Sequence, residues 1–148
     1  MAIEALKQQL TGLLEQMYRE GCLDEQFHQL QLLQDESNPG FVAEVISLFC
    51  DDSEKILTEL TRILAQDVVE FNNITAFVHQ LKGSSSSIGA HKVKLACNKF
   101  RTCCENTNKE GCQEALDLVK QDFYTLRTKF QNFVQLEQKI QALENGQM

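Results

Sequence analysis

Apolar residues recur along the chain at intervals of three and four, the spacing that places side chains on one face of an α-helix. After Pro39 the steps between apolar positions are 3, 4, 7, 4 and 3, and within residues 71–88 they are 3, 4, 3, 4 and 3. Both stretches are therefore predicted to be amphipathic helices. Their inward faces are Val42, Val45, Phe49, Ile56, Leu60 and Ile63, and Phe71, Ile74, Val78, Leu81, Ser85 and Ile88.

Residues that favour helix ends divide the N-terminal part of the chain. A helix at residues 2–20 is expected to precede a second at 25–34, with Asp24 as the N-cap of the second. Asn38 and Pro39 are predicted to begin the third helix, as N-cap and first helical residue.

Further breaks divide the rest of the chain. Gly89 is predicted to end the fourth helix, and a polar, Asn-rich loop is expected at residues 105–111. The two remaining helices have apolar faces at Val93, Cys97 (or Ala96), Phe100 and Cys104, and at Ala115, Val119, Phe123 (or Leu126), Phe130, Phe133 and Ile140. The apolar spacing also breaks at residues 51–53, where a kink or an outward turn would fit.

Composition agrees with an all-α fold. The chain has one Pro, no Trp and seven Gly in 148 residues, fewer turn residues than a β-rich domain needs. We expect one domain, an antiparallel four-helix bundle with two additional N-terminal helices packed across it. Residues 1–36 would form an N-terminal helical cap of that domain, and residues 37–148 the bundle.

The charge is negative overall and unevenly distributed. A net charge of −7 argues against a nucleic-acid partner, and no apolar run is long enough for a membrane span. Residues 1–70 hold 14 acids against 4 bases, whereas residues 71–148 hold 10 bases against 7 acids. Between residues 79 and 101 there are five bases and no acid, which would suit an acidic partner: Lys82, Lys92, Lys94, Lys99 and Arg101.

The six cysteines form no CxxC pair, and the N-terminus carries polar residues where a secretory signal would be apolar. We expect reduced thiols, several of them in the core. A zinc site is the alternative, although its spacing fits no known ligand pattern. Its ligands would come from Cys97, Cys103, Cys112 and His91.

Residues 83–90 read Gly-Ser-Ser-Ser-Ser-Ile-Gly-Ala, a composition typical of a flexible linker. The apolar spacing nevertheless continues through it from Leu81 to Ile88, which favours helix. A phosphate-binding loop is excluded because Ile88 stands where the second Gly is needed, Gly89 where Lys is needed and Ala90 where Ser or Thr is needed.

On this helix, His79 lies about 100° around from Val78 of the inward face. Its own face includes the residues three, four and seven positions ahead, which are Lys82, Gly83 and Ser86. Helical side chains lean toward the N-terminus, so Lys82 leans over His79. Gly83 has no side chain and leaves the imidazole uncovered.

An uncovered imidazole beside a cation suits phosphoryl transfer. His79 and Ser86 are about 10 Å apart along the axis, too far for a serine hydrolase pair, and a convex helix face offers no cleft for acid–base catalysis. A neutral imidazole can accept a phosphoryl group, whose oxygens Lys82 would stabilise. The alternative is an inert surface histidine, the interpretation kept for His28 and His91.

Residues 78–89 read Val-His-Gln-Leu-Lys-Gly-Ser-Ser-Ser-Ser-Ile-Gly. This stretch resembles the signature of plant histidine-containing phosphotransfer proteins, His-Gln-x-Lys-Gly-Ser-Ser-x-Ser-x-Gly, at every fixed position. The resemblance extends in length and layout over essentially the whole chain. It implies that His79 is the phosphoacceptor, Lys82 the neighbouring cation and Gly83 the residue that provides access. Supporting roles at the docking surface are expected for Gln80, Ser84 and Ser86.

The resemblance also implies partners. A hybrid sensor histidine kinase would donate from the phospho-Asp of its receiver domain, and response regulators would accept on theirs, in cytokinin signalling. The chain would be a carrier without ATP-dependent kinase activity, a cofactor or a metal of its own, because the receivers carry the Mg²⁺. We expect a monomer in cytoplasm and nucleus, without nucleic-acid or membrane partners.

Two other functions compete with this hypothesis. The first is a helical adaptor without chemistry, in which the His79 face packs against a partner. The second is a metal-dependent four-helix enzyme, which lacks the paired Glu-x-x-His ligands such enzymes need.

Overall fold

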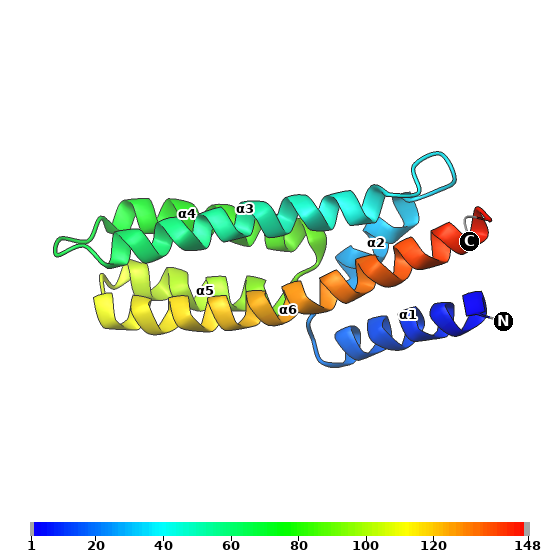
Figure 1. Cartoon of the computed structure of the whole chain (residues 1–148). Helices are drawn as coiled ribbons and strands as arrows, with labels where there is room; N and C mark the ends of the chain where they lie inside the picture. The colour runs from blue at the N-terminus through cyan, green and yellow to red at the C-terminus, as the bar shows by residue number, and fades with distance from the viewer. Residues whose placement is uncertain (1, 147–148) are drawn as a thin grey trace.

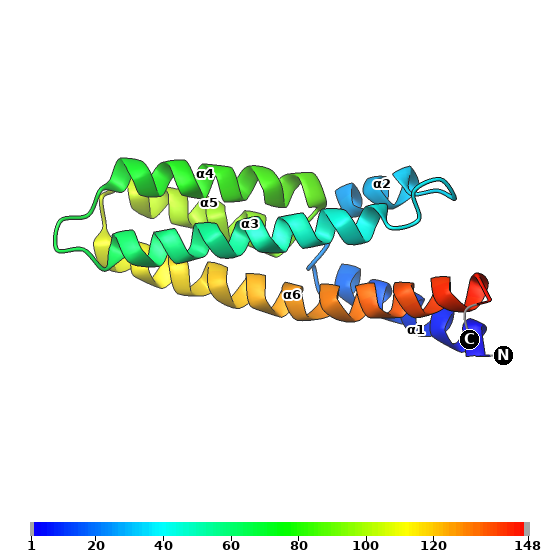
Figure 2. The same ribbon diagram turned by 45° about the horizontal axis from the view of Figure 1, so that its top comes forward.

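The computed structural model describes residues 2–146, which form six α-helices and no strand, so the all-α prediction is confirmed (Figure 1). The helices are α1 (Ala2–Arg19), α2 (Glu25–Leu33), α3 (Phe41–Leu64), α4 (Phe71–Ile88), α5 (His91–Glu105) and α6 (Lys109–Glu144). Helices α3 to α6 form an antiparallel bundle. The shorter α5 packs along one half of α6, and α1 lies along its other half (Figure 1, Figure 2).

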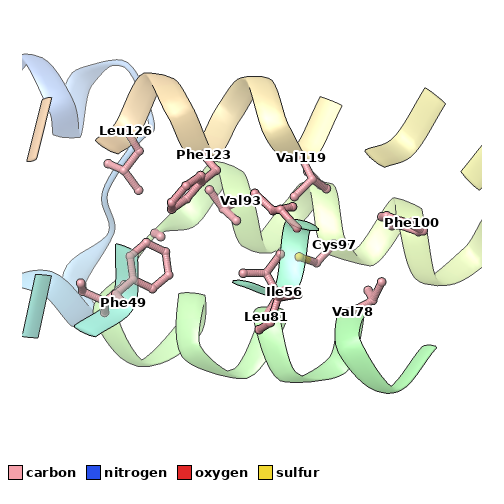
Figure 3. Packing of buried hydrophobic residues seen from close by; sticks show 14 of the residues in the cluster. Phe49, Ile56, Val78, Leu81, Val93, Cys97, Phe100, Val119, Phe123 and Leu126 are labelled. Atoms are coloured by element: carbon pink, nitrogen blue, oxygen red, sulfur yellow. The ribbon is translucent and has the colours of Figure 1, made fainter. Parts of the chain in front are cut away.

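The bundle has α4 between α3 and α5, diagonally opposite α6. Its core consists of the inward faces of all four helices, as Figure 3 shows for Val78 and Leu81 of α4 facing Val93 and Cys97 of α5. The predicted inward residues of α4 are buried except Phe71, which is half-buried. The apolar spacing therefore predicted correctly which side of α4 faces the core.

Phenylalanines join α2 to the bundle. The ring of Phe27 on α2 packs against two phenylalanines of α6. It stacks on Phe130, with 5.6 Å between the ring centroids, and meets Phe133 edge-on, with 5.8 Å between the centroids. Phe49 of α3 meets Phe123 edge-on at 5.9 Å. Aromatic pairs in these geometries add to the free energy gained by burial, so this cluster fixes α2 to the bundle.

The predicted start of α3 is wrong by two residues. The helix begins at Phe41 rather than at Pro39, and Gly40 rather than Asn38 is its N-cap. The Asn38 side chain instead accepts a hydrogen bond from the backbone N–H of Asp35. The side chain of Gln34 caps the helix from outside, accepting from the Val42 N–H at 2.9 Å.

Helix α3 continues unbroken through residues 51–53, where the sequence would have fitted a kink. Ser53 takes an inward position and is fully buried, so a polar residue interrupts the apolar spacing without interrupting the helix. The Gly-Ser segment is likewise helical to Ile88, which confirms helix over linker.

The end of α4 is held against the N-terminal segment. Gly89 ends the helix as predicted, with φ at +82°. Its carbonyl accepts from the Asp24 N–H at 2.9 Å, and the His91 N–H donates to the Cys22 carbonyl at 3.1 Å. Asp24 also caps α2 as predicted, accepting from the Gln26 N–H at 3.0 Å. The α4–α5 turn and the α1–α2 connection thus fix each other.

The predicted boundary between residues 1–36 and 37–148 falls in the connection between α2 and α3.

Four of the six cysteines are buried and serve as core residues: Cys22, Cys97, Cys104 and Cys112. Within residues 2–146, no helix is long and apolar enough to cross a membrane.

Replacing Gly89 by Ala is expected to destabilise the fold by about 2 kcal/mol or more, because left-handed backbone strains any residue with a Cβ. The new Cβ would also lie 2.5 Å from the Phe27 backbone nitrogen. Urea unfolding followed by circular dichroism measures this loss. The matched control is Gly12→Ala in α1, expected to gain up to about 1 kcal/mol from helix propensity. Equal stability of Gly89→Ala and wild type would contradict the role given to this turn.

Candidate functional site

The outer face of α4 is a continuous exposed stripe. Its buried face consists of Ile74, Val78, Leu81, Ser85 and Ile88. Because a helix turns about 100° per residue, burying these positions turns the positions between them outward. His79 is exposed near the middle of the helix, and Gln80 and Gly83 are exposed beside it. The structure therefore brings together the predicted phosphoacceptor and its access residue on an open surface.

Gly83 leaves open space in front of the imidazole. A Cβ built on Gly83 would meet nothing within 4 Å in the described part of the chain, apart from its own helix backbone. Packing therefore does not require glycine at this position. A larger side chain there would lean toward the helix N-terminus, over His79.

Lys82 lies on the flank of α4 that faces α5 and is half-buried. Burial raises the pKa of the Cys97 thiol on α5 to about 12, and the Lys82 ammonium acts in the opposite direction. The ammonium is thus close enough to α5 to influence a core thiol. It is also on the turn next to His79, where it can approach negative charge placed on the imidazole.

The predicted docking residues separate into two groups. Gln80 is exposed, and Ser86 is half-buried but lies within about 20° of the direction of His79. Ser84 points about 140° away from His79. Its hydroxyl donates to the Leu81 carbonyl at 3.1 Å. Ser84 is therefore engaged by its own helix and does not share the face of His79; its docking role stays a prediction.

The five bases between residues 79 and 101 do not form one free surface. Lys94 lies 3.9 Å from a carboxylate oxygen of Asp24, and Arg101 pairs with Glu105 at 3.2 Å. Burial raises the pKa of Asp122 on α6, and the nearby Lys92 and Lys99 lower it. The cations lie around α5 toward several acidic partners, and only Lys82 belongs to the helix of His79.

Two further residues share the exposed stripe and were missed in the sequence. Ala76 and Asn72 lie three and seven positions before His79, and both are exposed. Both precede the histidine, and their side chains lean away from it toward the helix N-terminus. The same helical spacing counted backward identifies both residues.

Possible metal ligands are not clustered in the described part of the chain. Among residues 2–146, no group of three or more His, Cys, Asp or Glu side chains is placed to hold a metal ion. The zinc alternative therefore has no such cluster to depend on.

A hollow of about 530 Å³ lies between α3 and α6. It is lined by residues such as Cys50 and Arg127, and His79 does not line it.

An exposed histidine at the middle of one helix of a four-helix bundle, with a cation one turn ahead and an uncovered approach, is the arrangement expected of a phosphotransfer domain. Comparison with known proteins agrees. Residues 44–146 match the family model described as Hpt domain. The chain belongs to this family.

Individual relatives match over most of their length. The chain is 54% identical to histidine-containing phosphotransfer protein 2 of Oryza sativa, covering 99% of both chains. It is 50% identical to histidine-containing phosphotransfer protein 1 of Arabidopsis thaliana, over 90% of this chain and 86% of the relative. The X-ray structure of a histidine-containing phosphotransfer protein from rice superimposes with a TM-score of 0.91 at 54% identity. It covers 96% of this chain and 100% of that one.

Proposed function

We propose that His79 is the residue through which this phosphotransfer protein carries a phosphoryl group between receiver domains. The observation that carries the proposal is the exposed imidazole on α4 with open space at Gly83. A receiver domain holds its phospho-Asp in a recessed acidic site, so the accepting nitrogen must project from the carrier. A convex helix face with an uncovered histidine meets that requirement.

The reaction is a reversible in-line displacement. The lone pair of a neutral imidazole nitrogen, Nε2, attacks the phosphorus of the receiver's phospho-Asp. An N–P bond forms as the acyl P–O bond breaks, and the electron pair stays on the Asp carboxylate. The Lys82 ammonium stabilises the phosphoryl oxygens as their charge shifts toward His79. The second half-reaction runs the same steps backward onto another receiver.

The donor would be the receiver of a hybrid sensor histidine kinase, and the acceptors would be response-regulator receivers, in cytokinin signalling. Mg²⁺ would be held by the receiver's own acidic residues. The carrier itself needs no cofactor and no ATP-dependent kinase activity. We further propose a monomer that works in cytoplasm and nucleus, since relaying a signal to response regulators requires it to move between partners.

Replacing His79 by Gln is expected to abolish phosphate uptake, because the amide has no nucleophilic ring nitrogen. Wild-type protein incubated with a phosphorylated receiver and Mg²⁺ should gain phosphate that is labile in acid and stable in alkali. The control is His28→Gln, at an exposed position of α2, which should label like wild type. Labelling of His79→Gln at the wild-type level would refute the site assignment, whereas a wild type that takes up no phosphate would favour the helical adaptor.

Replacing Gly83 by Leu is expected to slow transfer by about tenfold or more while the protein stays folded. The leucine side chain would cover the imidazole and displace the receiver from its reacting distance. Gly83→Ala is the matched control, because its methyl meets open space. It should transfer nearly as fast as wild type and gain up to about 1 kcal/mol of stability. Rapid-quench transfer rates and urea unfolding measure both, and normal kinetics in Gly83→Leu would disprove the access role.

Replacing Lys82 by Ala is expected to lower the transfer rate constant by about tenfold, because a half-buried charge near the phosphoryl group acts partly through solvent. Lys139→Ala removes the same charge from α6, diagonally opposite α4, and should leave the rate unchanged. Single-turnover kinetics at saturating receiver separate this effect from weaker docking. Equal rate constants for both variants would assign Lys82 no part in the chemistry.

A further inference from the structure

Two buried thiols touch where α5 is joined to α6. Cys104 lies in the last turn of α5 and Cys112 in the first turn of α6. Their sulfur atoms are 3.7 Å apart, and the two residues are 3% and 0% exposed. Helix α5 ends and helix α6 begins at this end of the bundle (Figure 1).

The connection between the two helices is held rigidly by hydrogen bonds. The Thr107 N–H donates to the Cys104 carbonyl at 3.0 Å, and the Cys112 N–H donates to the Asn108 carbonyl at 2.9 Å. The Asn108 side chain caps α6 by accepting from the Gly111 N–H at 3.0 Å. The two thiols are therefore held in contact by the backbone around them.

We propose that Cys104 and Cys112 are a redox-active pair that forms a reversible disulfide when hydrogen peroxide is the oxidant. A disulfide needs its sulfurs about 2.05 Å apart, so they must approach by about 1.6 Å, which rotation of the side chains can supply. The pair is distinct from the His79 site and does not depend on phosphotransfer.

The chemistry uses both thiols and one peroxide. One thiolate attacks a peroxide oxygen, so that an S–O bond forms, the O–O bond breaks and water leaves after protonation. The second thiol attacks the sulfenic sulfur, an S–S bond forms, the S–O bond breaks and a second water leaves. The two thiols lose two electrons and two protons, and the peroxide takes them up.

Burial sets the rate of this reaction. It raises the pKa of Cys104 to about 12 and also raises that of Cys112, so few thiolates exist at neutral pH. The pair should therefore oxidise slowly and resist mild oxidants. Cys103 is half-buried and adjacent in sequence. It is the thiol that competes with Cys104 in any test.

Peptide mapping tests the pair directly. Reduced full-length protein is treated with hydrogen peroxide, its remaining thiols are blocked with N-ethylmaleimide, and trypsin cleaves after Arg101, Lys109 and Lys120. We expect residues 102–109 linked to residues 110–120, and blocked thiols reduced from six to four. The melting temperature should rise by about 5 °C, because the bond closes a short loop of the unfolded chain, and dithiothreitol should reverse the rise.

Three variants assign the bond to its cysteines. Cys103→Ser should retain the linked peptides, whereas Cys104→Ser and Cys112→Ser should each lose them. Three results would overturn the proposal: a link that disappears in Cys103→Ser, oxidised but unlinked cysteines in the wild type, or a link between two chains on a non-reducing gel. Because the wild-type map alone reports the link, a variant that folds poorly does not obscure the answer.

Discussion

The burial of one face of α4 is the constraint on which the site depends. Five residues at helical spacing enter the core, and none of them is more than 2% exposed. A helix held by that face cannot rotate without exposing apolar surface, at about 25 cal/mol for each Å². His79 is therefore directed outward by the residues that bury the other side of its helix. The core behind α4 supplies the orientation of the imidazole.

The serine run follows from the same constraint. Ser85 is fully buried, and its hydroxyl has no hydrogen-bond partner in the described structure, which is unfavourable by itself. Its small side chain faces the core where a larger residue would hold the neighbouring helices apart. Ser84 and Ser87 donate to carbonyls of their own helix, at Leu81 and Gly83. The segment thus keeps its helix while presenting only small side chains around the histidine.

The spacing of apolar residues predicted the helices and the exposure of His79. Features that depend on contacts between distant parts of the chain could not be predicted in this way. The helices and the exposure of His79 follow from a period of 3.6, which the sequence displays without knowledge of the fold. The start of α3 could not be found that way, because it is capped by the side chain of Gln34, the residue that follows α2. The basic stretch was misleading for the same reason. Lys94 meets Asp24, seventy positions earlier, so closeness in sequence did not mean one free surface.

A carrier that exchanges phosphoryl groups with several receivers benefits from a site this simple. An enzyme surrounds its substrate with groups that stabilise one transition state. In the proposed function, the described chain offers His79 and Lys82 on a convex face, so most of the stabilisation must come from whichever receiver is docked. Neither transfer direction is then strongly favoured by the carrier. The rigid parts of the molecule lie elsewhere, in the phenylalanine cluster, the turn at Gly89 and the α5–α6 connection, and they keep α4 in place while its outer face stays free for successive partners.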